Sequence, residues 1–320
     1  MFCLRNISRS VYILFFLFLN SISLTSQAAD KETFKPFAMA EQTNIKMADA
    51  KSKIEQQIKQ SPFSIVAEYS PYDDAYIYII TSDELKSLAS EAEYGGFAAP
   101  QRVSLTRIKD QMQIAYTNPV YMQHIYRMKN VNLQPILDQM KQAFGFEQFF
   151  GGEGLSARKL KRYKYSFGLE DFKSFYELPE YDTHEEAIDA LIEGFSKKDS
   201  GITKVYEIKI PGKDQLIFGV AMNKKDSGDD ALDTRTTMNI IDHLPLKRTA
   251  YLPYEIMVDD NNIIALHARF RIAAFFYDLK MFGPHGFGKL FSTPTAYNKA
   301  FTKLSGGSVQ QSTSDNGFIN

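Results

Sequence analysis

The chain has few of the residue types that specialised chemistry needs: its 320 residues include one cysteine, five histidines and no tryptophan. A single cysteine forms neither an internal disulfide nor a thiolate metal cluster. Lys and Arg (37) nearly balance Asp and Glu (38), and the net charge of -1 gives no overall reason to expect nucleic-acid binding. The sequence therefore predicts no metal, no cofactor and no nucleic-acid partner, and it offers no recognisable catalytic set.

Long hydrophobic runs are also scarce. An apolar run at residues 11–19 follows two arginines; its length fits the central region of a secretory signal peptide and is too short to span a bilayer. We expect residues 1–28 to be a signal peptide cut near Ala28, the alternative being an uncleaved membrane anchor. The only cysteine, Cys3, would leave with it. The mature protein is then expected to be cysteine-free, without a membrane span, and periplasmic or secreted.

What is present is one order of helical and strand patterns that occurs twice. The first half has a helical pattern at 43–60, two strands, a short helix, a hairpin and further helices. The second half repeats this order from a capping box at 183–186, with its hairpin at 250–266. The two hairpins align with Val103–Ile114 over Leu252–Ile263.

These patterns predict an α+β fold of two similar two-layer domains, with helices packed on antiparallel sheets, related by tandem duplication. The alternative is two unrelated α+β domains that share an element order. The predicted division is a signal peptide at 1–28, an N-terminal segment at 29–42, a first repeat at 43–145, an aromatic and basic inter-repeat segment at 146–182, a second repeat at 183–304 and a disordered tail at 305–320.

Each half resembles the small prokaryotic family called domain of unknown function 302. In the second half, 216–219 (LIFG) and 242–247 (DHLPLK) are similar to two signatures of the family, and 114–119 (IAYTNP) in the first half is similar to its closing step. The chain departs from the pattern at 78–81, where the family has Phe-Gly, and at 266–269, where it has Asn-Pro. The resemblance implies an α+β sandwich and no activity, because the family has none assigned.

The best candidate for a small-molecule site lies near the ends of the two hairpins. His267 stands where the family pattern has its Asn-Pro step, beside Arg269 and Arg271. We expect an anion or carboxylate site there; the alternative is that both arginines face solvent on the first turn of a helix. The candidate ligand-binding residues are His267, Arg269, Arg271, Tyr254, Asn118 and Tyr121.

Two further motifs each allow a functional and a structural interpretation. Asp242 and His243 could supply a base and its orienting acid, but adjacent side chains point apart, which favours a helix-end contact. Gly283 to Lys289 fits the first positions of a Walker A loop, yet Leu290 stands where that loop has Ser or Thr. We expect a loop that closes a helix, with anion binding by its backbone N–H groups as the alternative.

The inter-repeat segment carries a basic stretch interleaved with tyrosines: Arg158, Lys159, Lys161, Arg162 and Lys164. Such a stretch fits an anionic lipid surface; the alternative is a linker whose aromatic residues complete the core. The sequence thus favours a non-enzymatic exported protein that binds a small or lipidic ligand at the junction of its repeats. The other two hypotheses are a hydrolase that uses His267 or His243, and an envelope adaptor that contacts anionic surfaces through residues 158–164.

Overall fold

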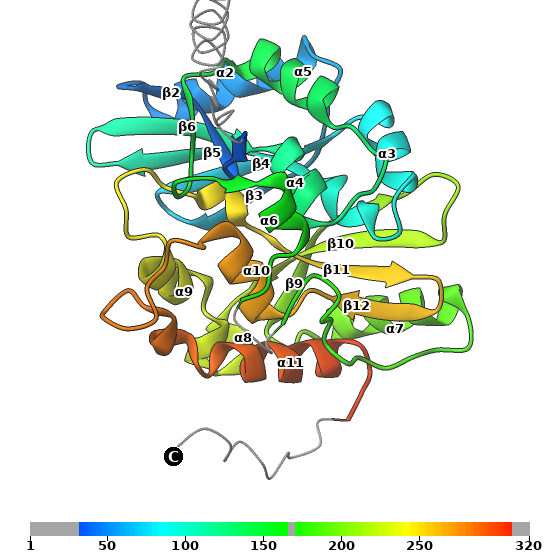
Figure 1. The fold of residues 1–320 in the computed structure, drawn as a ribbon. Helices are drawn as coiled ribbons and strands as arrows, with labels where there is room; N and C mark the ends of the chain where they lie inside the picture. The colour runs from blue at the N-terminus through cyan, green and yellow to red at the C-terminus, as the bar shows by residue number, and fades with distance from the viewer. Residues whose placement is uncertain (1–31, 166–169, 309–320) are drawn as a thin grey trace, which may run out of the picture. The chain divides into compact units, whose positions relative to one another are not determined.

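The structure is a computed structural model and describes residues 32–165 and 170–308 (Figure 1). The predicted signal peptide and most of the predicted tail lie outside these residues. Among the described residues, no helix has both the length and the apolar character needed to cross a membrane. The chain from Thr33 onward forms one compact unit.

The first half builds an antiparallel sheet of six strands in the order β3-β4-β5-β6-β2-β7. The strands are β2 (Phe37–Thr43), β3 (Ser64–Tyr72), β4 (Ala75–Thr81), β5 (Gln101–Ile108), β6 (Gln111–Thr117) and β7 (Gln148–Phe150). Strands β2 and β7 come largely from segments that the sequence placed outside the first repeat. They extend the sheet beyond β6, so the flanking segments are part of this fold.

Helices α2 (Met47–Lys59) and α5 (Gln134–Phe144) pack together over the first sheet, at the top of Figure 1. Each buries apolar residues four positions apart, such as Ile54 and Ile58 on α2, because side chains at i and i+4 share one helix face. The other helices of this half are α3 (Asp83–Ser90), α4 (Pro119–Ile125) and α6 (Ala157–Lys161).

The second half builds an antiparallel sheet of four strands in the order β12-β11-β10-β9. The strands are β9 (Ile202–Lys209), β10 (Gln215–Met222), β11 (Tyr254–Asp259) and β12 (Asn262–Ala265). Its helices are α7 (His184–Lys197), α8 (Lys224–Ser227), α9 (Thr234–Ile241), α10 (Ala268–Phe275) and α11 (Thr293–Leu304). Helices α7 and α11 contact each other and this sheet, at the bottom of Figure 1. A further pair, β1 (Thr33–Phe34) and β8 (Leu155–Ser156), stands apart from both sheets.

The predicted α+β class, with helices packed on antiparallel sheets, is confirmed. Each half runs through a helix, two strands, a helical segment, two strands and two further helices; the middle segment is α3 in the first half and the pair α8 and α9 in the second. The four strands follow the same order across both sheets. The hairpin alignment differs from the predicted one by two residues. The two-residue turns place Lys109 opposite Asp260 in the alignment, both with the positive φ that such turns need (55° and 58°).

The two halves meet through corresponding helices and through several polar contacts of the second half with the first sheet. The hydroxyl of Tyr121 on α4 donates to the carbonyl of Ala274 on α10. Gln113 of β6 bonds to the backbone of Lys247 in both directions, with Nε2 donating to the carbonyl at 2.6 Å and Oε1 accepting from the N–H at 2.8 Å. The segment around Lys247 is therefore fixed by the first half, and it also forms the site described next.

Candidate functional site

A pocket of about 390 Å³ lies between the segment 241–248 and the segment 278–285. Its volume falls within the range of ligand pockets in proteins. The lining residues are Ile241, His243, Leu244, Arg248, Asp278, Leu279, Lys280, Phe282, Pro284 and His285. We call this space the histidine-pair pocket.

The first wall forms where α9 ends at Ile241. The Asp242 side chain is buried, and both of its carboxylate oxygens accept from the backbone N–H of Arg248, at 3.0 and 2.9 Å. This contact closes residues 242–248 into a loop and leaves His243 on the exposed side. Burial raises the pKa of Asp242 to about 6. Asp242 and His243 therefore point apart, as expected, and Asp242 is a structural residue of the loop.

The second wall is the loop that follows α10. Backbone N–H groups of Phe287 and Gly288 donate to the carbonyls of Lys280 and Met281, at 3.0 and 2.9 Å. The N–H of Gly286 donates to the carbonyl of Gly283. These amides are used within the loop and do not form an anion cradle. The segment 283–289 thus closes the loop after a helix, as the plainer interpretation predicted, and the anion-cradle alternative is wrong for these amides.

Two imidazoles join the walls. The rings of His243 and His285 are stacked, with centroids 4.3 Å apart and planes 14° apart. Partial burial, followed by the neighbouring His285 ring, lowers the pKa of His243. The neutral form of His243 is therefore favoured. Binding of a proton or of an anion at the two imidazoles changes the net charge of the pocket.

One ion pair connects the two walls of the pocket. The buried guanidinium of Arg248 binds the Asp278 carboxylate through two nitrogens, and the Nη1–Oδ1 distance is 2.6 Å. Asp278 is the only acidic residue among the lining residues, and Arg248 neutralises it. Lys280 and the two imidazoles remain as the polar groups that can meet the charge of a ligand.

The predicted ligand-binding residues Asn118 and His267 are helix caps. The Asn118 side chain accepts from the backbone N–H groups of Val120 and Tyr121 at the start of α4. Nδ1 of His267 accepts from the N–H of Arg269 at the start of α10. The two residues thus have the same role at corresponding positions of the two halves.

The other predicted ligand-binding residues are also engaged within the fold. The hydroxyls of Tyr121 and Tyr254 donate to backbone carbonyls. Nη1 of Arg269 binds Glu170 at 2.9 Å, so the arginine is paired at the surface. None of the six candidates lines the histidine-pair pocket.

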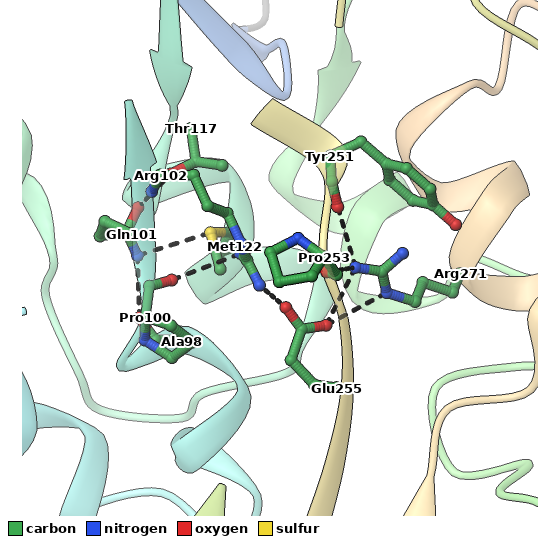
Figure 2. A network of polar contacts seen from close by, with 10 residues as sticks. All are labelled: Ala98, Pro100, Gln101, Arg102, Thr117, Met122, Tyr251, Pro253, Glu255 and Arg271. Carbon is green, nitrogen blue, oxygen red and sulfur yellow. Dashed lines mark hydrogen bonds and ion pairs between the residues drawn. The ribbon is translucent and has the colours of Figure 1, made fainter. Parts of the chain in front are cut away.

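Arg271 belongs to a buried ionic network that links the halves, in which Glu255 lies between Arg271 and Arg102 (Figure 2). Its Nη2 is 3.0 Å from Oε2 of Glu255 on β11, and Glu255 also pairs with Arg102 on β5 of the first half. The guanidinium of Arg271 lies 4.1 Å and 4.2 Å from the ring centroids of Tyr251 and Tyr254. The alternative in which Arg271 faces solvent is wrong, because it is 2% exposed.

The basic stretch lies on and after α6. Its residues Arg158, Lys159, Lys161, Arg162 and Lys164 are exposed. Lys164 lies 3.8 Å from Asp171. For the other four, no ion pair forms with any residue of 32–165 or 170–308. The stretch is therefore a surface of largely uncompensated positive charge, and the buried Leu160 holds α6 to the protein.

Sequence reasoning missed His285, Arg248 and Lys280. No local pattern connects them, because the two walls are brought together only by the packing of the second half. Among residues 32–165 and 170–308, no three His, Asp or Glu side chains are grouped so as to hold a metal ion.

Comparison of the chain with protein-family models, with curated proteins and with solved structures finds no match. The resemblance of each half to the domain of unknown function 302 family therefore stays a prediction. The functional argument rests on the geometry of the histidine-pair pocket and of the surface around it.

Proposed function

We propose that this protein is a non-enzymatic binding protein for a small amphipathic anion, held in the histidine-pair pocket. The observation that carries the proposal is the composition of the lining. Apolar residues such as Leu244, Leu279 and Phe282 share it with Lys280 and two imidazoles, while the one acid is paired. A ligand with an apolar body and one anionic group fits both parts.

The place of the pocket supports the proposal that a ligand binds near the junction of the halves. The segment 241–248 forms one wall, and Lys247 within it is bonded to Gln113 of the first half. Arg248 anchors the other wall through Asp278. Both walls are thus held by contacts that do not involve the ligand, so the pocket is preformed and the cost of ordering it on binding is small.

The test is isothermal titration calorimetry with octanesulfonate, octanol and inorganic sulfate. Octanesulfonate is expected to bind more tightly than either of the others, because octanol lacks the charge and sulfate lacks the apolar body. Replacing a charged contact, as in Lys280→Gln, should weaken binding about fivefold, which corresponds to ~1 kcal/mol. Lys46→Gln, on the surface before α2, is the matched control. Equal binding of sulfate and octanesulfonate, or no effect of Lys280→Gln, contradicts the proposal.

Acidity gives a second readout. The pKa of His243 is lowered, so His243 gains its proton only at acidic pH. A sulfonate keeps its charge over this range, and its affinity should therefore rise about fivefold between pH 8 and pH 5 as positive charge appears in the pocket. The variant His243→Gln should bind with a flatter pH profile. A profile identical to that of the unchanged protein would mean that His243 does not face the ligand.

A hydrolase is the second candidate function, favoured by one observation: two imidazoles and one carboxylate, that of Asp278, share the pocket. Among the described residues, neither His243 nor His267 makes a hydrogen bond to a serine hydroxyl. The hypothesis is tested with p-nitrophenyl esters and phosphodiesters. Turnover that is lost in His243→Gln supports it, and turnover that is unchanged in this variant argues against it.

We also propose that the protein is exported and that its halves arose by tandem duplication. The apolar run at 11–19 supports export, and the shared element and strand order supports duplication. Mass spectrometry of the protein from cell fractions is expected to find a chain that begins at Ala29 in the periplasm or the medium. A chain that retains Met1 in the cytoplasm would contradict the first of these proposals.

A further inference from the structure

The loop after α10 exposes large apolar side chains next to the basic stretch. Phe282 is 81% exposed, Phe291 is 66% exposed and Met281 is 40% exposed. Three of the seven large hydrophobic residues that the described part of the chain leaves exposed thus come from eleven consecutive positions. A monomeric soluble surface rarely gathers such residues without a partner that covers them.

The exposed position of these side chains is built into the loop. The backbone bonds from Phe287 to Lys280 and from Gly288 to Met281 tie the base of the loop together. Residues 282–286 form its tip, and a further bond from Gly286 to Gly283 closes the turn. The tip is therefore a defined protrusion, so Phe282 is presented outward without a large ordering cost.

The basic stretch is continuous with this loop. Tyr165 follows Lys164, and its ring lies 4.7 Å from the ring of Phe287, in an edge-on contact. Its hydroxyl lies 3.4 Å from Sδ of Met281. The loop adds two more exposed lysines, Lys280 and Lys289, which form no ion pair with any described residue. Protruding apolar residues and unpaired cations thus occupy one neighbourhood of the surface.

We propose that this neighbourhood, which we call the basic–aromatic face, docks the protein on a bilayer that contains anionic phospholipids. The face consists of Arg158, Lys159, Lys161, Arg162, Lys280, Met281, Phe282, Lys289 and Phe291. Charge complementarity draws the cations to anionic head groups, and the phenylalanines enter the boundary between head groups and acyl chains. The histidine-pair pocket shares the lining residues Lys280 and Phe282 with this face.

A bilayer fits the face better than a nucleic acid does. A polyanion would use the cations alone or stack bases on aromatic rings, whereas Met281 next to Phe282 offers an aliphatic side chain with no stacking surface. The chain as a whole is close to neutral, with a net charge of -1, so attraction to a polyanion would have to come from this face. Docking on an anionic bilayer uses both kinds of exposed group, because the cations contact head groups while the methionine and the phenylalanines insert into lipid.

The first experiment is co-sedimentation with vesicles of phosphatidylcholine that contain phosphatidylglycerol, and with vesicles of pure phosphatidylcholine. We expect binding to the anionic vesicles, weakened by salt. The variant K159Q/K161Q/R162Q should lower the partition coefficient about a hundredfold, at a factor of about five for each lost charge near the surface. The matched control K46Q/K59Q/K209Q removes three exposed lysines elsewhere and should bind like the unchanged protein. Equal loss in both variants, or equal binding to both vesicle types, would overturn the proposal.

The second experiment measures insertion. Because the chain contains no tryptophan, Phe282→Trp places a single tryptophan at the tip of the loop, and its emission can be excited selectively. With anionic vesicles, its emission should shift to the blue and be quenched by brominated acyl chains. Phe146→Trp, at a 40% exposed position of the first half, is the control and should do neither. Binding without any shift at position 282, or equal affinity for single-stranded DNA, would overturn docking on a bilayer.

The docking face and the pocket are tested independently. The variant K159Q/K161Q/R162Q changes no residue that lines the pocket. We expect it to lose vesicle binding and to keep octanesulfonate binding. Vesicle binding in a protein that binds no octanesulfonate would remove the proposed ligand and leave the docking face in place.

Discussion

The two halves of the molecule share an order of elements but differ in the connection between their last two helices. In the first half, α4 leads to α5 through residues 126–133, and Tyr126, Met128, Val131 and Leu133 of this connection are buried. In the second half, α10 leads to α11 through residues 276–292, which form the loop that exposes two phenylalanines and lines the pocket. The first connection packs into the core, whereas the second buries some of its side chains and exposes others. Under the proposed function, the loop that only the second half carries supplies the binding site, and the shared elements supply the scaffold.

A second comparison concerns the start of the helix that precedes each connection. Asn118 caps α4 and His267 caps α10, each by accepting from backbone N–H groups. The asparagine cap has no charge at any pH, whereas the imidazole accepts through Nδ1 only while it is neutral. The second half therefore carries a pH-sensitive contact at a position where the first half has none.

The largest expected effect tests whether the halves form one cooperative unit. Replacing Glu255 by Ala leaves Arg102 and Arg271 buried with no carboxylate, and we expect a loss of about 3–5 kcal/mol in the free energy of unfolding. Urea unfolding followed by circular dichroism should still show one transition. Two separate transitions in the unchanged protein would mean that the halves are independent domains.

The control for this prediction removes all three charges at once. The variant R102M/E255L/R271M leaves no buried ion without a partner, so it should be far less destabilised than Glu255→Ala. If it is destabilised equally, the cost arises from lost packing and not from unpaired charge.

The next effect concerns the pocket wall, which exists only in the second half. The pKa of Asp242 is raised to about 6 in the fold, so the native state holds this proton more tightly than the unfolded chain does. Its contribution to stability is complete at low pH and is lost as pH rises through about 6, a change of ~3 kcal/mol. Asp242→Asn should remove this pH dependence, measured as the difference between the two proteins in urea unfolding at pH 4 and pH 7. A constant difference would show that Asp242 does not titrate between these values.

A smaller effect of about 1 kcal/mol is expected from exchanging the caps. His267→Asn gives α10 the cap of α4 and should preserve stability at pH 7. Burial lowers the pKa of His267, so its stabilising contribution is present at neutral pH and is lost as pH falls through the lowered value. The variant should lack this loss, as seen in thermal unfolding between pH 7 and pH 4. An unchanged pH profile would mean that the Nδ1 contact contributes nothing.

The change with the smallest expected effect lies in the second connection and is compared with a change in the first. Phe282→Ser changes a side chain that is 81% exposed and should alter stability by no more than about 0.5 kcal/mol. Val131→Ser places a polar group at a buried position of the first connection and should cost about 1–3 kcal/mol. Equal costs in thermal unfolding would contradict the assignment of one connection to the core and the other to the surface.

Sequence patterns predicted what local chemistry determines. The predicted cap at Thr183 is in place, because its hydroxyl and the N–H of Glu186, three residues later, meet within one turn. The hairpin of the second half begins later than predicted, at Tyr254. Arg271 explains the difference, because its guanidinium donates hydrogen bonds to the carbonyls of Tyr251 and Pro253. No sequence pattern near these two residues indicates that contact.

The candidate site was predicted only in part, because its parts meet through packing between distant segments. The sequence singled out His243 and the glycine-rich loop, each as a separate motif. It gave no reason to place His285 against His243 or Arg248 against Asp278. The anion site expected around His267 is not formed, because carboxylates from other parts of the chain pair with its two arginines. Arg269 binds Glu170, and Arg271 binds Glu255.

The central claim is that the second connection, and not the first, binds the ligand. Chemical-shift mapping by NMR of the purified chain with octanesulfonate tests it most directly. The account predicts shifts of the amides of residues 241–248 and 278–288, with those of 126–133 unchanged. The titration stays below the concentration at which octanesulfonate aggregates. Shifts confined to the first half, or no shifts at all, would contradict the claim.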